Sequence, residues 1–170
     1  LKIQEITMIL NHYGIEQKVI KLNLIYIKNN KTKYIQDFEN DLIKRMKQLI
    51  DINIIPLSHK KKFSSNKEVI NHEGELIMKE LKDSDLYYCF DKEGEKFDSQ
   101  NFSKLIFSQN KTIHLIIGGA FGISADVKMQ AKKLISFSDM EFSHEIFRIM
   151  LLEQIYRAQC IFTNHPYHQN

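Results

Sequence analysis

Short apolar runs alternate along this chain with longer segments of helical periodicity. In residues 20–27 the side chains first alternate between apolar and polar and then become fully apolar, which is typical of a buried strand. Four further runs also predict strands, and Pro56 places the second strand at a sheet edge or at a strand end. The predicted strands are residues 20–27, 52–57, 86–90, 112–117 and 134–137.

The segments between these runs have apolar residues three and four positions apart, which is the spacing of amphipathic helices. Capping residues mark three helix starts: Ser65 with Glu68 at capping-box spacing, Asp98 or Ser99, and Ser124. We expect helices over residues 34–49, after Ser65, after Asp98, over 124–133 and over 143–159, with a polar turn at 91–95. Strands that alternate with helices predict an α/β domain with a mostly parallel sheet flanked by helices.

The last predicted helix is apolar on nearly every side. Eight of the eleven residues from Ile146 to Tyr156 are apolar, and they do not keep to one stripe. A helix of this kind is buried on more than one side. In a domain of this size, a second subunit would supply the extra cover.

Composition narrows the class of protein. The chain has 170 residues, of which 43% are hydrophobic, so one domain with a sizeable core is expected and a disordered or fibrous chain is excluded. No apolar run approaches the roughly 18 residues that span a bilayer. A net charge of +3 permits a nucleic-acid partner without identifying one.

Two cysteines, Cys89 and Cys160, form no Cys-x-x-Cys pair, which favours a reducing cytoplasm over a disulfide scaffold. The chain begins without Met, and its first residues lack the pattern of a secretory signal. We expect residues 1–17 to be an N-terminal extension without regular structure, followed by a single domain over residues 18–170.

The strongest local feature is the glycine turn from Gly118 to Gly122, directly after a predicted buried strand. Glycines at this position let the backbone bend tightly and approach a ligand, and α/β proteins bind small molecules at strand ends. The spacing matches neither a dinucleotide site nor a P-loop. The simpler alternative is a turn that needs glycine only for positive φ angles.

Histidines near the C-terminus are candidates for proton transfer, because imidazole titrates near neutral pH. They are His165 and His168, with Tyr167 between them and His144 upstream. Zinc held by Cys160 and the two tail histidines is disfavoured, because these residues do not supply four ligands at the usual spacing. The simpler alternative is a solvated tail.

Arg148, Glu153 and Arg157 share the last predicted helix. Glu153 and Arg157 stand in the favourable i, i+4 order of a helix-stabilising ion pair, which leaves Arg148 or Arg157 free to hold a phosphate or carboxylate. The lysines at 60–62 and 132–133 have two interpretations. Solvated surface charge is the simpler one, and a nucleic-acid-binding patch is the other.

The order of these pieces resembles the RlmH family, bacterial SPOUT-class methyltransferases that act on a pseudouridine of large-subunit ribosomal RNA. The resemblance covers residues 18–170. It is most specific in the last 60 residues, where the glycine turn is followed by Tyr156-Arg157-Ala158 and by His165-Pro166-Tyr167-His168. The chain ends in Gln169-Asn170, where the family tends to have a basic residue.

The resemblance implies a SPOUT, or α/β-knot, fold with a C-terminal trefoil knot that binds S-adenosyl-L-methionine. It also implies a homodimer without a metal or a membrane partner, whose substrate is N3 of a pseudouridine in helix 69 of 23S rRNA within the assembled ribosome. The cofactor contacts carried over to this chain are Phe90, Gly118, Phe137, Ser138, Asp139, Met140, Glu141 and Phe142.

Chemistry at N3 requires that its proton leaves before the nitrogen becomes a good nucleophile, so a general base and accurate positioning are needed. The candidates for the base or its orienting partner are His168 and Tyr167, with His144 behind them, while Arg148 or Arg157 would hold RNA phosphate. One alternative is a non-catalytic protein that binds ribosomes or RNA and keeps a vestigial cofactor pocket. A weaker alternative is a phosphate-binding regulatory domain. Such a domain would need clustered acidic residues at the strand ends to hold Mg²⁺, and the predicted strand ends lack them.

Overall fold

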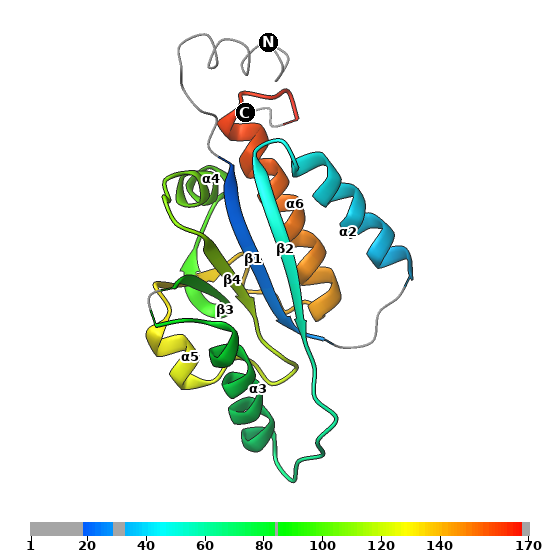
Figure 1. The fold of residues 1–170 in the computed structure, drawn as a ribbon, viewed down its shortest axis with the longest axis vertical. Helices are drawn as coiled ribbons and strands as arrows, with labels where there is room; N and C mark the ends of the chain where they lie inside the picture. The colour runs from blue at the N-terminus through cyan, green and yellow to red at the C-terminus, as the bar shows by residue number, and fades with distance from the viewer. Residues whose placement is uncertain (1–18, 29–32, 84, 168–170) are drawn as a thin grey trace.

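The computed structural model describes residues 19–28, 33–83 and 85–167, and it confirms the predicted α/β fold (Figure 1). Five parallel strands form one sheet in the order β2-β1-β4-β3-β5. The elements are β1 (Ile20–Ile27), α2 (Lys33–Met46), β2 (Ile50–Leu57), α3 (Asn66–Glu80), β3 (Leu86–Lys96), α4 (Ser99–Phe107), β4 (Ile113–Ile117), α5 (Ala125–Gln130), β5 (Lys133–Ser136) and α6 (His144–Phe162).

Helices cover both faces of the sheet because successive side chains of a strand point to opposite faces. Leu22 and Leu24 of β1 belong to a core that includes residues of α2, α4 and α6. Ile25 of β1 belongs to a second core with Ile77 of α3 and Val127 of α5. The sheet is therefore buried on both sides, as parallel sheets usually are.

The sequence signals for strand and helix ends are largely confirmed. Pro56 lies in β2, which is an edge strand. The side chain of Ser65 accepts a hydrogen bond from Glu68 N at the start of α3, and Asp98 accepts one from Asn101 N at the start of α4. Ser124 likewise caps α5. Each cap satisfies an amide that the first helical turn leaves without a backbone partner.

The expected end of the third strand at Phe90 is wrong. β3 pairs with β5 at Phe90 and again at Glu95, so the polar residues 91–94 form a bulge inside one long strand. Gly94 allows this arrangement, because a Cβ atom there would lie 2.6 Å from the backbone nitrogen of Ile135. Turn-like composition and a bulge are hard to distinguish in a sequence.

Part of the cover of α6 comes from the chain itself. Leu151, Leu152, Ile155 and Ala158 are buried against the sheet and the flanking helices α2 and α4. Ile146 and Phe162 remain about half exposed. The apolar character of α6 therefore has an explanation within one chain, and the homodimer stays a prediction.

Two predictions from the sequence lie beyond these observations. The expected N-terminal extension, residues 1–17, falls outside the described residues, and the trefoil knot stays a prediction. In the part of the chain that the structure describes, no helix is long and apolar enough to cross a membrane.

Candidate functional site

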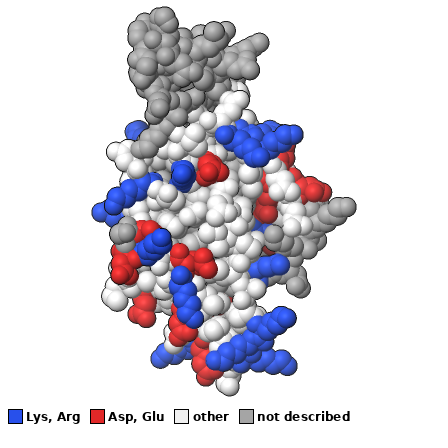
Figure 2. Space-filling model, in the orientation of Figure 1, with Lys and Arg blue, Asp and Glu red and all other residues white. Residues whose placement is uncertain are grey.

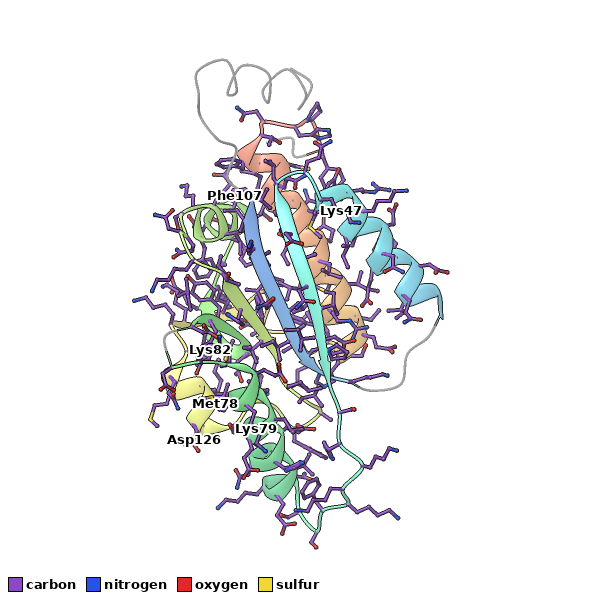
Figure 3. All side chains as sticks on the ribbon, viewed as in Figure 1. Lys47, Met78, Lys79, Lys82, Phe107 and Asp126 are labelled. Atoms are coloured by element: carbon purple, nitrogen blue, oxygen red, sulfur yellow. The ribbon has the colours of Figure 1, made fainter. Side chains whose placement is uncertain are left out.

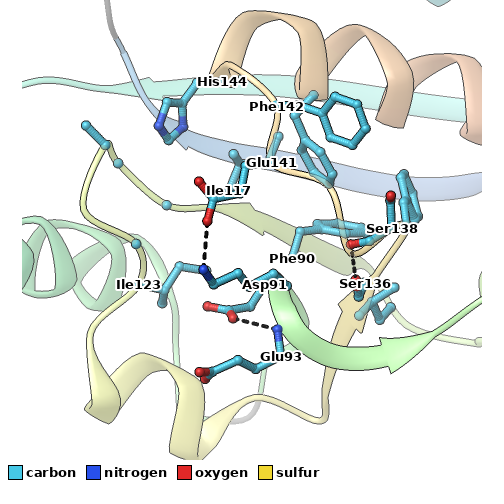
Figure 4. A pocket seen from close by; sticks show the side chains of 18 of the residues that line it. Phe90, Asp91, Glu93, Ile117, Ile123, Ser136, Ser138, Glu141, Phe142 and His144 are labelled. Atoms are coloured by element: carbon cyan, nitrogen blue, oxygen red, sulfur yellow. Dashed lines mark hydrogen bonds and ion pairs between the residues drawn. The ribbon is translucent and has the colours of Figure 1, made fainter.

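A cavity of about 430 Å³ opens beyond the carboxyl ends of β4 and β5 and beside the bulge in β3 (Figure 4). This is the edge of a parallel sheet at which α/β proteins bind small molecules, and the volume is typical of a ligand pocket. The wall consists of residues 90–93, 117–123, 135–138 and 140–142, with Lys128, His144 and Phe147.

Glycines in the wall are required for two different reasons. At Gly118 a Cβ atom would lie 2.5 Å from Ile123 Cγ1 and 2.9 Å from the Gly122 carbonyl oxygen. At Gly119 it would lie 2.2 Å from a carboxylate oxygen of Glu73. Gly122 has a φ of +94° and open space around it, so only its backbone conformation requires glycine. Packing within the chain thus explains the glycines at 118 and 119, and positive φ explains Gly122, while the approach of a ligand to this turn stays a prediction.

Aromatic rings form one side of the cavity. The ring of Phe90 lies 5.3 Å from that of Phe137 and 5.6 Å from that of Phe147, between centroids. Phe137 and Phe147 also contact each other, at 5.4 Å. This surface suits an apolar or aromatic part of a ligand.

The rim of the cavity is polar and its charges are paired. Lys92 donates a hydrogen bond of 2.7 Å to Glu141, which joins the bulge of β3 to the segment after β5. That hydrogen bond raises the pKa of Lys92 and lowers the pKa of Glu141. Lys128 lies 2.5 Å from Asp91. A ligand at this rim therefore meets two lysines and three acids, because Glu93 also lines the cavity and shares Lys128 with Asp91.

Backbone turns shape the segment between β5 and α6. Ser136 donates a hydrogen bond to the Ser138 carbonyl oxygen, and the Ser138 hydroxyl accepts one from Met140 N. Phe142 follows and closes the wall, and Figure 4 shows Ser136, Ser138 and Phe142 on the same side of the cavity. These two hydrogen bonds fix the path of the segment along the cavity wall.

The structure brings together seven of the eight cofactor residues carried over from the resemblance. Phe90, Gly118, Phe137, Ser138, Met140, Glu141 and Phe142 all line the cavity. Asp139 does not. Its carboxylate lies 2.5 Å from Lys96 and is exposed.

Of the three candidate catalytic residues that the structure describes, only His144 lines the cavity, at the first position of α6. Tyr167 lies elsewhere, with its hydroxyl 3.0 Å from Glu153 and its ring 4.9 Å from the guanidinium of Arg157. Burial raises the pKa of Tyr167, and the hydrogen bond to Glu153 adds to this effect. His168 falls outside the described residues.

Arg148 is buried away from the cavity, with 3% of its surface exposed. It donates a hydrogen bond to Glu39 of α2, and its guanidinium lies 4.3 Å from the ring centre of Tyr26. Arg157 donates to Glu153 at 2.6 Å. The expectation that one of these two arginines has no acidic partner is therefore wrong, because Glu39, more than a hundred residues away in sequence, could not be paired with Arg148 from helix spacing.

Sequence reasoning missed the cavity residues of the bulge, Asp91, Lys92 and Glu93, because they were assigned to a turn. It also missed Glu73, a buried acid of α3 behind Gly119, which lies 3.5 Å from His59. The only sequence signal at Glu73 is an acid within a helix, and acids are common there. Among the described residues, no cluster of three or more histidine, cysteine or acidic residues could hold a metal ion.

Comparison with known proteins shows to which family this chain belongs. The family model described as "Predicted SPOUT methyltransferase" matches residues 20–168. The Ribosomal RNA large subunit methyltransferase H of Dictyoglomus thermophilum is 37% identical over 153 residues, which cover 88% of this chain and 99% of the relative. The protein of the same name from Clostridium acetobutylicum is 35% identical over 159 residues, which cover 88% of this chain and 100% of the relative. The resemblance noted in the sequence is confirmed, and the chain belongs to the SPOUT methyltransferase family.

Proposed function

We propose that this protein is an S-adenosyl-L-methionine-dependent methyltransferase of the bacterial cytoplasm that methylates N3 of a pseudouridine in 23S rRNA of the assembled ribosome. The observation that carries the proposal is the cavity at the strand ends, which coincides with seven residues expected from the family to contact the cofactor. Relatives named for large-subunit ribosomal RNA methylation support the substrate class, since they match over nearly their whole length.

The residues present fit the cofactor. Gly118 lines the cavity, and its lack of a side chain lets the turn close against Ile123 and Gly122. The rings of Phe90 and Phe137 give apolar cover, and hydrogen bonds within residues 136–140 hold that segment along the cavity wall. The bound cofactor would supply an electrophilic methyl group on a sulfonium sulfur.

The chain's own residues must then orient the acceptor and remove its proton. His144 is the candidate within reach of the cavity, and we propose it as the general base or as the residue that orients the base. Tyr167 lies away from the cavity of its own chain, so we propose that Tyr167 and His168 of the tail serve this step in the cavity of the partner within the proposed homodimer. Arg148 would act from its buried position by holding α6, which begins at His144, against Glu39 of α2. A positioned base typically contributes about 10² to 10⁴ in rate.

The test is transfer of labelled methyl groups to ribosomes that lack the modification, with free 23S rRNA assayed alongside. We expect label in N3-methylpseudouridine of the ribosomes and little in free RNA. Cofactor binding without any transfer would contradict the proposal. Absence of cofactor binding as well would favour the alternative, a non-catalytic ribosome-binding protein.

Deleting residues 165–170 tests the role of the tail. We expect methyl transfer to fall about 10²-fold or more, the scale of a lost general base, while cofactor affinity is retained. His168→Ala should have the largest effect and change the pH profile near the ordinary histidine pKa of about 6.5. Tyr167→Phe should have a smaller effect and keep the profile. Full activity of the truncated protein would exclude a catalytic tail.

A further inference from the structure

The loop that joins β2 to α3 has a run of unpaired positive charge. Residues 58–67 contain four lysines and no acidic residue. Lys60, Lys61 and Lys62 are exposed, and within residues 19–28, 33–83 and 85–167 none of them has a carboxylate within ion-pair distance. Figure 2 shows blue side chains gathered at the lower end of the molecule, where Figure 1 places this loop.

Lysines on the other side of the cavity differ in this respect. Lys92, Lys96, Lys128 and Lys133 each lie within 2.5 to 2.7 Å of a carboxylate. Their charge is largely neutralised locally, so a polyanion that approaches the cavity meets net positive charge mainly at the 60–62 loop. The nearby acid Glu68 accepts a hydrogen bond from Ser64 N at the start of α3 and offsets one of these positive charges without pairing directly with any of the three lysines.

The base of the loop is anchored beside the cavity. Nε2 of His59 lies 3.5 Å from Oε1 of Glu73, and Oε2 of Glu73 lies against Gly119 of the cavity wall. Nδ1 of His59 donates to the Lys61 carbonyl oxygen at 3.2 Å. The ring of Phe63 lies 5.2 Å from that of His59. These contacts tie the loop at His59 and at the Lys61 backbone to Glu73, which lies against the glycine turn.

Topology puts the loop at the correct edge of the sheet. It follows β2, and all five strands are parallel, so it begins at the same carboxyl edge as the cavity beyond β4 and β5. A substrate whose reacting base enters the cavity would have its backbone within reach of this edge.

We propose that Lys60, Lys61 and Lys62 bind phosphates of the RNA substrate next to the cavity. The inference rests on the proposed function, because the substrate class comes from there. Ammonium groups on flexible stems act as point charges toward phosphates and position a backbone without reading its sequence. The loop offers no buried donor that would select a small anion, so its partner is a polyanion.

The test replaces Lys60, Lys61 and Lys62 together by Gln. The control replaces Lys47, Lys104 and Lys111 together by Gln. These lysines are also exposed, have no carboxylate partner among the described residues, and lie toward the amino edge of the sheet. Figure 3 shows Lys47 at the end of the molecule opposite the loop. Both variants have the same net charge.

We expect the loop variant to raise KM for unmodified ribosomes about tenfold or more. Its salt dependence should become shallower by up to about 2 in log–log slope, the value for three phosphate contacts to a single strand. The turnover number at saturating ribosomes and the dissociation constant for the cofactor should stay unchanged. The control should change KM less than about twofold.

An unchanged KM would overturn the proposal, because the three lysines would then not contribute to ribosome binding. An equal rise of KM in the control would also overturn it, because the loop would then act only through net charge. Ribosome binding measured by co-sedimentation separates this outcome from failure of the proposed function. If the wild-type protein transfers no methyl group, weaker co-sedimentation of the loop variant alone still supports the phosphate contact, and equal co-sedimentation refutes it.

Discussion

Individual residues at the cavity are constrained by space more than by chemistry. Gly118 lies so close to Ile123 and Gly122 that any side chain would displace the turn, whereas Asp139 of the neighbouring segment points to Lys96 and away from the cavity. Both residues were candidates for cofactor contact. Because of these different positions, we expect substitutions at the two residues to change cofactor affinity to different extents.

We expect Gly118→Ala to weaken cofactor binding about tenfold or more, because its Cβ atom would lie 2.5 Å from Ile123 Cγ1. Asp139→Asn should change the affinity less than about twofold, since an exposed ion pair contributes little. Calorimetric titration of both variants with S-adenosyl-L-methionine measures this difference. Equal affinities in two folded variants would show that the cofactor does not approach Gly118.

Glu73 makes stability depend on pH. Burial raises the pKa of its carboxyl, and the hydrogen bond from His59 and the charges of His144 and His72 only partly oppose this. A carboxyl whose pKa is raised on folding is more often protonated in the folded state, so its contribution to stability is fully present below the ordinary pKa, which is 4.5 here, and is lost as pH rises.

Glu73→Gln removes that titration. We therefore expect the unfolding free energy of the variant, relative to wild type, to increase as pH rises from below 4.5 to 7, and urea denaturation at several pH values measures it. A relative stability that falls over this range would mean that the charged form of Glu73 is the stabilising one.

Elements of the fold were predictable where one residue type has a local physical consequence. Ser65, Asp98 and Ser124 mark helix starts because their side chains reach amides two or three residues ahead. The bulge at residues 91–94 and the partner of Arg148 were not predictable, since both depend on contacts with segments distant in sequence. The glycine turn was recognisable as a candidate site, whereas the acid behind it was visible only after folding.

The contact between α2 and α6 includes one buried ion pair. Arg148 and Glu39 have side chains that are 4% and 9% exposed, whereas Arg157 and Glu153 of α6 are 27% and 24% exposed. Breaking a buried pair leaves one charge without compensation, which costs far more than loss of a surface pair.

We expect Arg148→Met to lower the unfolding free energy by about 3 to 5 kcal/mol. Arg157→Met should cost about 1 kcal/mol or less. Adding Glu39→Leu to Arg148→Met should restore most of the loss, because the uncompensated acid is then removed. Urea denaturation of the three variants tests this, and an Arg148→Met protein as stable as wild type would contradict the structural role assigned to the pair.

At the scale of the whole molecule, one apolar surface has no cover from the described part of the chain. A groove of about 560 Å³ runs between α2, α4 and α6, lined by Phe38, Phe97, Phe137, Ile149 and Met150 among others. Phe38 is 49% exposed, and Phe137 also lines the cavity at the strand ends. The homodimer proposed from the sequence would cover this groove and would place the partner next to the site.

Met150→Glu tests that arrangement, because a carboxylate in an apolar interface costs about 2 kcal/mol or more and weakens association roughly 30-fold. Met129→Glu is the matched control, since Met129 lies on α5, away from the groove, and is 78% exposed. Light scattering over a range of concentrations should show dimers for wild type and the Met129 variant and monomers for the Met150 variant. A wild-type protein that stays monomeric at high concentration would exclude the dimer, and dimers of unchanged stability in the Met150 variant would place the interface on another face.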